Sequence, residues 1–129
     1  MTQHIRVLVV DDQPRARKSI KTLLATWPEA GDVREAANGQ EAVRLVEESQ
    51  PDVVLMDARM PEMDGIEATR LIKARWPQVK VIVLSMCPDY VADATEAKAD
   101  AFFSKGTSPD QLLVTLAAVV ANTRKGELP

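Results

Sequence analysis

Short apolar segments alternate with helical segments five times along this 129-residue chain, and this alternation limits the possible folds more than any other feature. The apolar segments are typical of buried strands, and the segments between them carry apolar residues at helical spacing. Strands that alternate with helices form a parallel sheet with helices on both faces. The pattern predicts an α/β fold with strands at about 5–10, 33–37, 53–56, 79–85 and 101–104.

Capping residues mark the starts of the predicted helices. Asn38 and Asp64 are each followed three residues later by a glutamate, which is the reciprocal capping pattern of a helix start. Pro109 follows a serine and suits the first turn of the last helix. No internal linker interrupts the pattern, so we expect one domain over residues 1–122 and a C-terminal tail over 123–129.

The composition excludes several classes of protein. A net charge of −3 argues against a dedicated nucleic-acid surface. The single cysteine, Cys87, excludes an intrachain disulfide and suits a reducing compartment. No apolar stretch is long enough to span a bilayer, so we expect a cytoplasmic domain that binds neither membrane nor nucleic acid. The one basic cluster has helical spacing and is interpreted as a solvated helix face: Arg15, Arg17, Lys18 and Lys21.

Polar residues lie at the carboxyl ends of four of the five predicted strands. Asp11 and Asp12 follow the first strand, and Asp57 follows the third. Ser85 ends the fourth strand, and Lys105 follows the fifth. If the strand order is 2-1-3-4-5, these four strands are neighbours about 4.8 Å apart, at the edge where open α/β sheets bind ligands. Each residue alone is an ordinary helix cap or loop residue, but their joint placement indicates a site.

The chemistry of these groups indicates phosphoryl transfer. Two carboxylates at 4 Å repel by about 4 kcal/mol at the effective dielectric near a protein surface, so either one is protonated or a cation lies among them. Mg²⁺ fits the second case because it prefers hard oxygen ligands. Lys105 adds a positive charge suited to phosphate. Asp57 is therefore interpreted as the nucleophile that accepts a phosphoryl group.

Four segments together resemble the receiver domain of bacterial two-component response regulators: "VLVVDDQPRAR", "VLMDARMPEMDG", "VIVLS" and "AFFSKGTSPDQLL". The resemblance covers about residues 4–122 and implies a flavodoxin-like fold with a five-stranded parallel sheet of order 2-1-3-4-5. It implies that Asp57 takes a phosphoryl group from a sensor histidine kinase or a phosphotransfer protein. It also implies a role for the remaining residues: Asp11, Asp12, Asp57 and the backbone carbonyl of Arg59 for Mg²⁺, Ser85 and Lys105 for the phosphoryl group, and Phe102 as the switch residue.

Three residues depart from the common receiver pattern. Gly106 follows Lys105 where many relatives have proline, and Phe102 lacks the hydroxyl group of a switch tyrosine. Lys98 replaces a glycine that often precedes the fifth strand. If the backbone is left-handed there, lysine costs roughly 1 kcal/mol. The segments "ARWPQVKVIVLS" and "SKGTSPDQLL" resemble those of receivers that are joined to a DNA-binding helix-turn-helix domain.

Alternative functions remain open at this point. A phosphatase of the haloacid dehalogenase type also uses a strand-end aspartate, but its Asp-x-Asp pattern is not met because Gln13 follows Asp12. A receiver that serves only for docking is the other alternative. As a switch, the domain is expected to catalyse only its own phosphorylation and dephosphorylation, and to bind a partner or a second copy of the chain, as a homodimer, through its fourth and fifth strand-helix units. The sequence is compatible with a free-standing receiver or with a fragment of a DNA-binding regulator.

Overall fold

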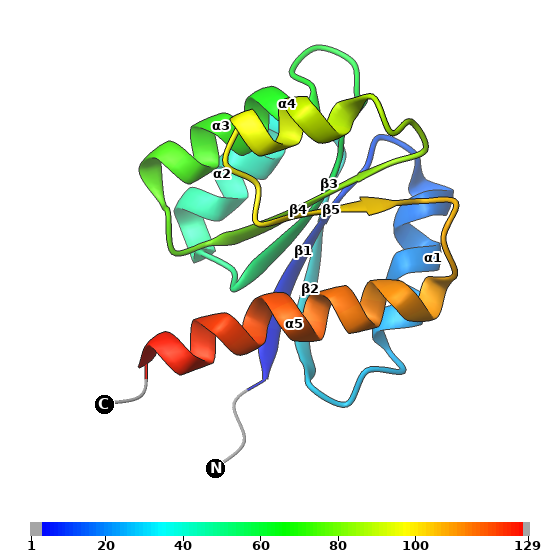
Figure 1. The fold of residues 1–129 in the computed structure, drawn as a ribbon, viewed down its shortest axis with the longest axis vertical. Helices are drawn as coiled ribbons and strands as arrows, with labels where there is room; N and C mark the ends of the chain where they lie inside the picture. The colour runs from blue at the N-terminus through cyan, green and yellow to red at the C-terminus, as the bar shows by residue number, and fades with distance from the viewer. Residues whose placement is uncertain (1–3, 128–129) are drawn as a thin grey trace.

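A computed structural model describes residues 4–127, with side chains described for residues 4–121, and it confirms the predicted alternation (Figure 1). The strands are β1 (Ile5–Val10), β2 (Ala30–Ala36), β3 (Val53–Asp57), β4 (Lys80–Ser85) and β5 (Ala101–Ser104). The helices are α1 (Pro14–Leu24), α2 (Gly39–Ser49), α3 (Gly65–Arg75), α4 (Tyr90–Glu96) and α5 (Pro109–Glu127). Neighbouring strands pair in parallel in the predicted order 2-1-3-4-5.

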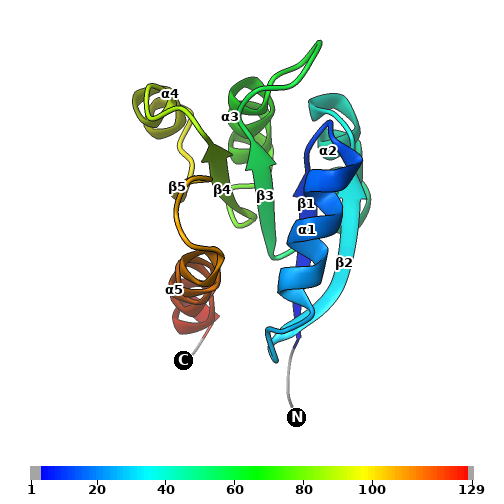
Figure 2. The same ribbon diagram turned by 90° about the vertical axis from the view of Figure 1, so that its right-hand side faces the viewer.

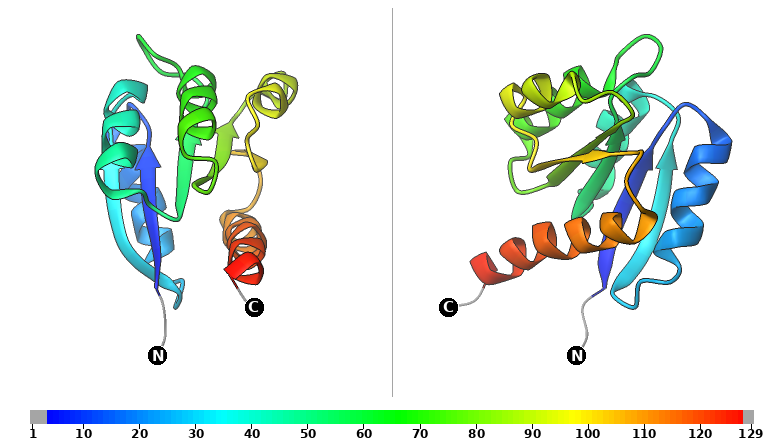
Figure 3. Two further views of the ribbon diagram at one scale, coloured as in Figure 1. Left: turned by 90° about the vertical axis from the view of Figure 1, so that its left-hand side faces the viewer. Right: turned by 45° about the vertical axis from the view of Figure 1, so that its right-hand side comes forward.

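The sheet separates two layers of helices. Figure 2 shows α2, α3 and α4 on one face and α1 and α5 on the other. Alternate side chains of a strand point to opposite faces, so Leu8 and Val10 of β1 pack in the first layer while Val7 and Val9 pack in the second. Figure 3 shows that α4 and α5 both lie at the edge of the sheet that ends in β5. The fold is therefore the expected flavodoxin-like α/β arrangement.

The structure differs from the prediction at β2 and α5. Strand β2 begins at Ala30, before the predicted start at residue 33. It is an edge strand paired only with β1, so polar residues such as Asp32 are tolerated where the pattern indicates a loop. Helix α5 continues to Glu127, past residue 122 where the sequence places the end of the domain. Residues 128–129 of the predicted tail lie outside the described residues.

The backbone at Lys98 is left-handed, with a φ of 73°, so the condition under which the sequence analysis expects strain at this lysine is met. The amide of Lys98 donates to the Thr95 carbonyl at 3.0 Å, and the amide of Ala99 donates to the Ala94 carbonyl at 3.0 Å. These two bonds form the Schellman motif that ends a helix. The last turn of α4 therefore requires a conformation that favours glycine but contains an exposed lysine.

Candidate functional site

An acidic cluster lies at the carboxyl ends of β1 and β3. Asp57 is the last residue of β3, and Asp11 follows the last residue of β1. One carboxylate oxygen from each of Asp11, Asp12 and Asp57 lies within 4.8 Å of the other two. Asp11 and Asp57 are buried, whereas Asp12 is exposed. The structure thus brings together the three carboxylates that the sequence analysis assigns to one site.

Lys105 joins this cluster from the end of β5. Its Nζ lies 3.0 Å from Asp11 Oδ2 and 3.1 Å from Asp57 Oδ1. The backbone amide of Lys105 donates to the Ser85 carbonyl at 2.9 Å, so the loop after β5 is attached to the end of β4. One ammonium group therefore serves two buried carboxylates, and the cluster keeps an excess of negative charge.

The pKa values show this imbalance. Burial raises the pKa of Asp57, and the charges of Asp11 and Asp12 raise it further against the opposing effect of Lys105. Burial alone would lower the pKa of Lys105, but its hydrogen bond to Asp11 and the negative charges around it raise the pKa overall. Three oxygen donors with excess negative charge fit a hard divalent cation such as Mg²⁺.

The loop between β3 and α3 places Asp57 by close backbone packing. The amide of Ala58 donates to the Leu84 carbonyl at 2.9 Å, and the amide of Gly65 donates to the Ala58 carbonyl at 3.0 Å. A Cβ atom at Gly65 would lie 1.9 Å from the Asp57 carbonyl oxygen, so only glycine allows α3 to begin this close to the site. Asp64 caps α3 by accepting the Glu67 amide at 2.8 Å.

An open cavity of about 410 Å³ adjoins this loop. It is lined by residues of the loop and the first residue of α4: Arg59, Met60, Pro61, Asp64 and Tyr90. Arg59 is exposed, two residues after Asp57 in the chain. The cavity is thus formed by the loop that follows Asp57 and by the start of α4.

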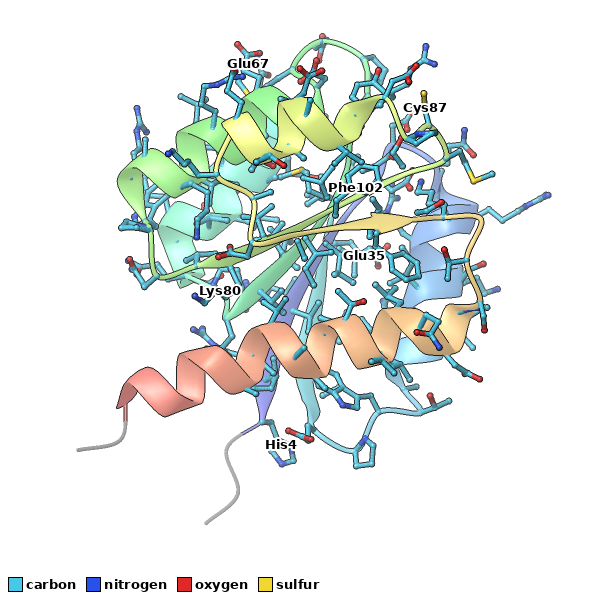
Figure 4. The ribbon with its side chains drawn as sticks, viewed as in Figure 1. His4, Glu35, Glu67, Lys80, Cys87 and Phe102 are labelled. Atoms are coloured by element: carbon cyan, nitrogen blue, oxygen red, sulfur yellow. The ribbon has the colours of Figure 1, made fainter. Side chains whose placement is uncertain are left out.

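The other two predicted site residues lie on β4 and β5. Ser85 is buried, and its Oγ accepts a hydrogen bond from the Cys87 amide at 3.0 Å. Phe102 is partly buried and packs in the layer of α2, α3 and α4 (Figure 4). Ser85 pairs with Ser104 in the sheet, and Phe102 pairs with Val83. The two residues are thus on adjacent strands, near the end that bears the site.

The only histidine and the only cysteine of the chain lie far apart. His4 is exposed next to the start of β1, as its sequence position predicts, and Cys87 follows the end of β4. Figure 4 shows them at opposite ends of the molecule. His4 therefore cannot act as a base for the Cys87 thiol.

Arg17 is a residue of this site that the sequence analysis missed. The basic cluster on α1 was interpreted as a solvated face, which is wrong for Arg17, because its side chain is only 16% exposed. Its Nη1 donates to the backbone carbonyl of Asp11 at 2.7 Å. The signal was in the spacing, since Arg17 precedes Ile20 by three residues and Leu24 by seven, on the inward face of the helix.

Comparisons with known proteins agree with this geometry. Residues 7–117 match the family model of the response regulator receiver domain. The chain is 40% identical over 113 residues to the uncharacterized transcriptional regulatory protein YhcZ of Bacillus subtilis, covering 86% of this chain and 53% of that protein. It is 38% identical over 117 residues to the transcriptional regulatory protein DegU of Brevibacillus brevis, covering 89% and 50%. The chain thus spans about half the length of these curated relatives.

Solved structures show the same similarity. A two-component response regulator of the LuxR family from Aurantimonas sp. matches with a TM-score of 0.88 and 33% identity, covering 93% of this chain and 87% of that one. The chemotaxis protein CheY4 of Vibrio cholerae matches with a TM-score of 0.81 and 26% identity, covering 90% and 98%. Within residues 4–127, no helix combines the length and apolar character of a membrane span. By sequence and by fold, the chain belongs to the response regulator receiver domain family of two-component systems.

Proposed function

We propose that Asp57 accepts a phosphoryl group from a phosphohistidine of a sensor kinase or phosphotransfer protein. The observation that carries this proposal is the position of Asp57, a buried carboxylate at the end of a central strand with Lys105 at 3.1 Å and two further carboxylates beside it. Such a group combines a nucleophile with the positive charge that a phosphoryl oxygen requires. Membership of the receiver family supports the same role.

The transfer exchanges one bond of phosphorus for another. A carboxylate oxygen of Asp57 forms a bond to phosphorus while the bond from phosphorus to the histidine nitrogen breaks. The nitrogen keeps the electron pair and takes up a proton from water. Lys105 then pairs with a phosphoryl oxygen, and the hydroxyl group of Ser85 donates a hydrogen bond to another. The domain thus catalyses only its own phosphorylation and, with water as the acceptor, its own dephosphorylation.

The residues that would hold Mg²⁺ are the acidic cluster and the loop after it: Asp11, Asp12, Asp57 and the backbone carbonyl of Arg59. The three clustered carboxylates support this assignment because they are hard oxygen ligands. The Arg59 carbonyl is included on the resemblance to receiver domains. When bound, the ion neutralises negative charge on the phosphoryl oxygens. Asp11 is buried in this cluster, whereas Asp12 is accessible to water.

Phosphorylation is the signal in this proposal. A phosphoryl group adds about −1.5 to −2 charge and strong acceptor oxygens, which would draw Ser85 and Lys105 toward it. Movement of Ser85 makes room for Phe102 to turn inward by packing alone. The surface formed by β4, α4, β5 and α5 would then change and bind a partner or a second copy of the chain. Because the matched part of the chain corresponds to about half of relatives that are transcriptional regulators, we propose that the chain acts as the receiver portion of such a regulator.

Intact-mass analysis after treatment with acetyl phosphate and Mg²⁺ tests the proposal. We expect one added phosphoryl group on the wild type and none on Asp57→Asn. Asp89→Asn is the matched control because Asp89 is exposed and makes no side-chain cap bond to α4. A phosphoryl group retained on Asp57→Asn would refute the assignment. Absence of modification on the wild type would favour a receiver that serves only for docking, and turnover of a generic phosphate ester would favour a phosphatase.

A further inference from the structure

Arg17 connects the acidic cluster to a second group of charges outside it. Its Nη1 donates to the Asp11 carbonyl at 2.7 Å, and its Nε donates to Glu35 Oε1 at 2.9 Å. The planar guanidinium thereby joins α1 to the loop after β1 and to β2. Its fixed fork of donors suits this bridging geometry better than a lysine ammonium does.

Glu35 keeps the guanidinium in place. Lys21 Nζ donates to the other carboxylate oxygen of Glu35 at 2.9 Å, so two cations of α1 share this one carboxylate of β2 (labelled in Figure 4). Hydrogen bonds from Lys21 and Arg17 hold the pKa of Glu35 below its ordinary value. The carboxylate therefore stays ionised at neutral pH and retains both partners.

Every polar atom of Asp11 has a partner. Its amide donates to the Ala36 carbonyl at 3.1 Å, and its Oδ1 accepts the Gln13 amide at 2.9 Å. Its Oδ2 accepts Lys105 at 3.0 Å, and its carbonyl accepts Arg17. The carbonyl bond is the contact that fixes the peptide plane between Asp11 and Asp12. The orientation of that peptide plane determines the direction in which the Asp12 side chain leaves the backbone.

We propose that Arg17 is a positioning residue of the acidic cluster, which sets the direction of the Asp11 and Asp12 carboxylates by holding the Asp11 carbonyl. This inference rests on the proposed function for its consequence in magnesium binding. The positioning role of Arg17 and its positive charge have opposite effects on the affinity for Mg²⁺. Arg17 is a cation near an acidic site, so its charge alone weakens Mg²⁺ binding, and its removal would tighten binding. If Arg17 positions the carboxylates, its removal weakens binding instead.

Calorimetric titration with Mg²⁺ at fixed ionic strength, well below the unfolding temperature, separates these effects. We expect Arg17→Met to bind Mg²⁺ about tenfold more weakly than the wild type. In Arg17→Lys the side chain can bind either the Asp11 carbonyl or Glu35 but not both, so this variant should recover part of the affinity for Mg²⁺. Arg15→Met is the matched control, because it removes the same charge from an exposed position of the same helix and should leave affinity unchanged or slightly increased. Affinity of Arg17→Met equal to or above that of Arg15→Met would overturn the proposal.

Hydrogen exchange of the metal-free proteins gives a readout that does not depend on magnesium. The Gln13 amide is bound to Asp11 Oδ1, so it reports the order of this loop. We expect its exchange to be about tenfold faster in Arg17→Met, while amides of β3 exchange at the wild-type rate. Unchanged exchange at Gln13 would overturn the positioning role even if the wild type binds magnesium. If the wild type does not bind magnesium, the proposed function fails, and exchange at Gln13 alone decides the role of Arg17.

Discussion

Replacement of Lys105 by methionine should increase the stabilisation that Mg²⁺ gives. The Lys105 ammonium pairs with Asp11 at 3.0 Å and Asp57 at 3.1 Å, and these are two of the three carboxylates that we assign to the ion. Removing one partner of a buried ion pair costs about 3–5 kcal/mol, and the 27% exposure of the Lys105 side chain reduces this to about 2–3 kcal/mol for the metal-free protein. Without the ammonium, the carboxylates repel each other more and lack a competing cation. We therefore expect Mg²⁺ to bind Lys105→Met about tenfold more tightly, which adds about 1.4 kcal/mol of stabilisation at the same concentration.

Urea unfolding followed by circular dichroism, with and without Mg²⁺ at matched ionic strength, measures this difference. The free energy of unfolding should fall in metal-free Lys105→Met and recover part of the loss when Mg²⁺ is added. Lys18→Met is the matched control, since it removes an equal charge from the exposed face of α1 and should show the wild-type response. Equal increments from Mg²⁺ in Lys105→Met and the wild type would show that the lysine and the metal do not compete for the same carboxylates.

Three further changes test the site and its surroundings. Burial raises the pKa of Asp57 above its ordinary value of 3.8. The protonated Asp57 side chain therefore contributes to the free energy of unfolding below pH 3.8, and this contribution is lost as the pH rises through the raised pKa. Asp57→Asn should therefore stabilise the metal-free protein at neutral pH, and a pH series of urea midpoints should show this gain shrinking toward pH 3.8. Lys98→Gly should raise the free energy of unfolding by about 1 kcal/mol by relieving the left-handed backbone, whereas Lys98→Ala should not. Gly65→Ala should lower the free energy of unfolding by roughly 1–3 kcal/mol and weaken Mg²⁺ binding in a titration, because the added Cβ displaces the Asp57 backbone.

Much of the site could be predicted because the fold places strand ends together. Asp57 follows an apolar run, and the strand order 2-1-3-4-5, which the resemblance to receiver domains implies and the structure confirms, makes the ends of β1 and β4 its neighbours. Lys105 is far from Asp11 in sequence, yet topology alone brings its strand to the correct edge of the sheet. Residue type at the strand ends, together with the strand order that the resemblance implies, was therefore sufficient to predict the acidic cluster and its lysine.

The interactions that the sequence did not reveal depend on side-chain reach. A basic residue on a helix is compatible with a solvated face or with a partner across the loop, and only the structure shows that Arg17 bends toward the Asp11 carbonyl. Strand β2 was partly missed because an edge strand needs few apolar residues. In contrast, the left-handed backbone of Lys98 was predictable from the residue that commonly occupies that position in similar chains.

The connection between β4 and β5 explains how one event at the site can reach a large surface. The amide of Lys105 donates to the carbonyl of Ser85, so the two residues assigned to the phosphoryl group are joined through their backbones as well as through that group. In the proposed switch, a displacement of Ser85 would therefore act on the start of the loop that leads to α5. The Oγ of Ser85 also accepts a hydrogen bond from the amide of Cys87, which lies in the segment that leads to α4. The segments that lead to α4 and α5 are thus both hydrogen-bonded to one buried residue, Ser85, which is why the proposed switch would act on both helices.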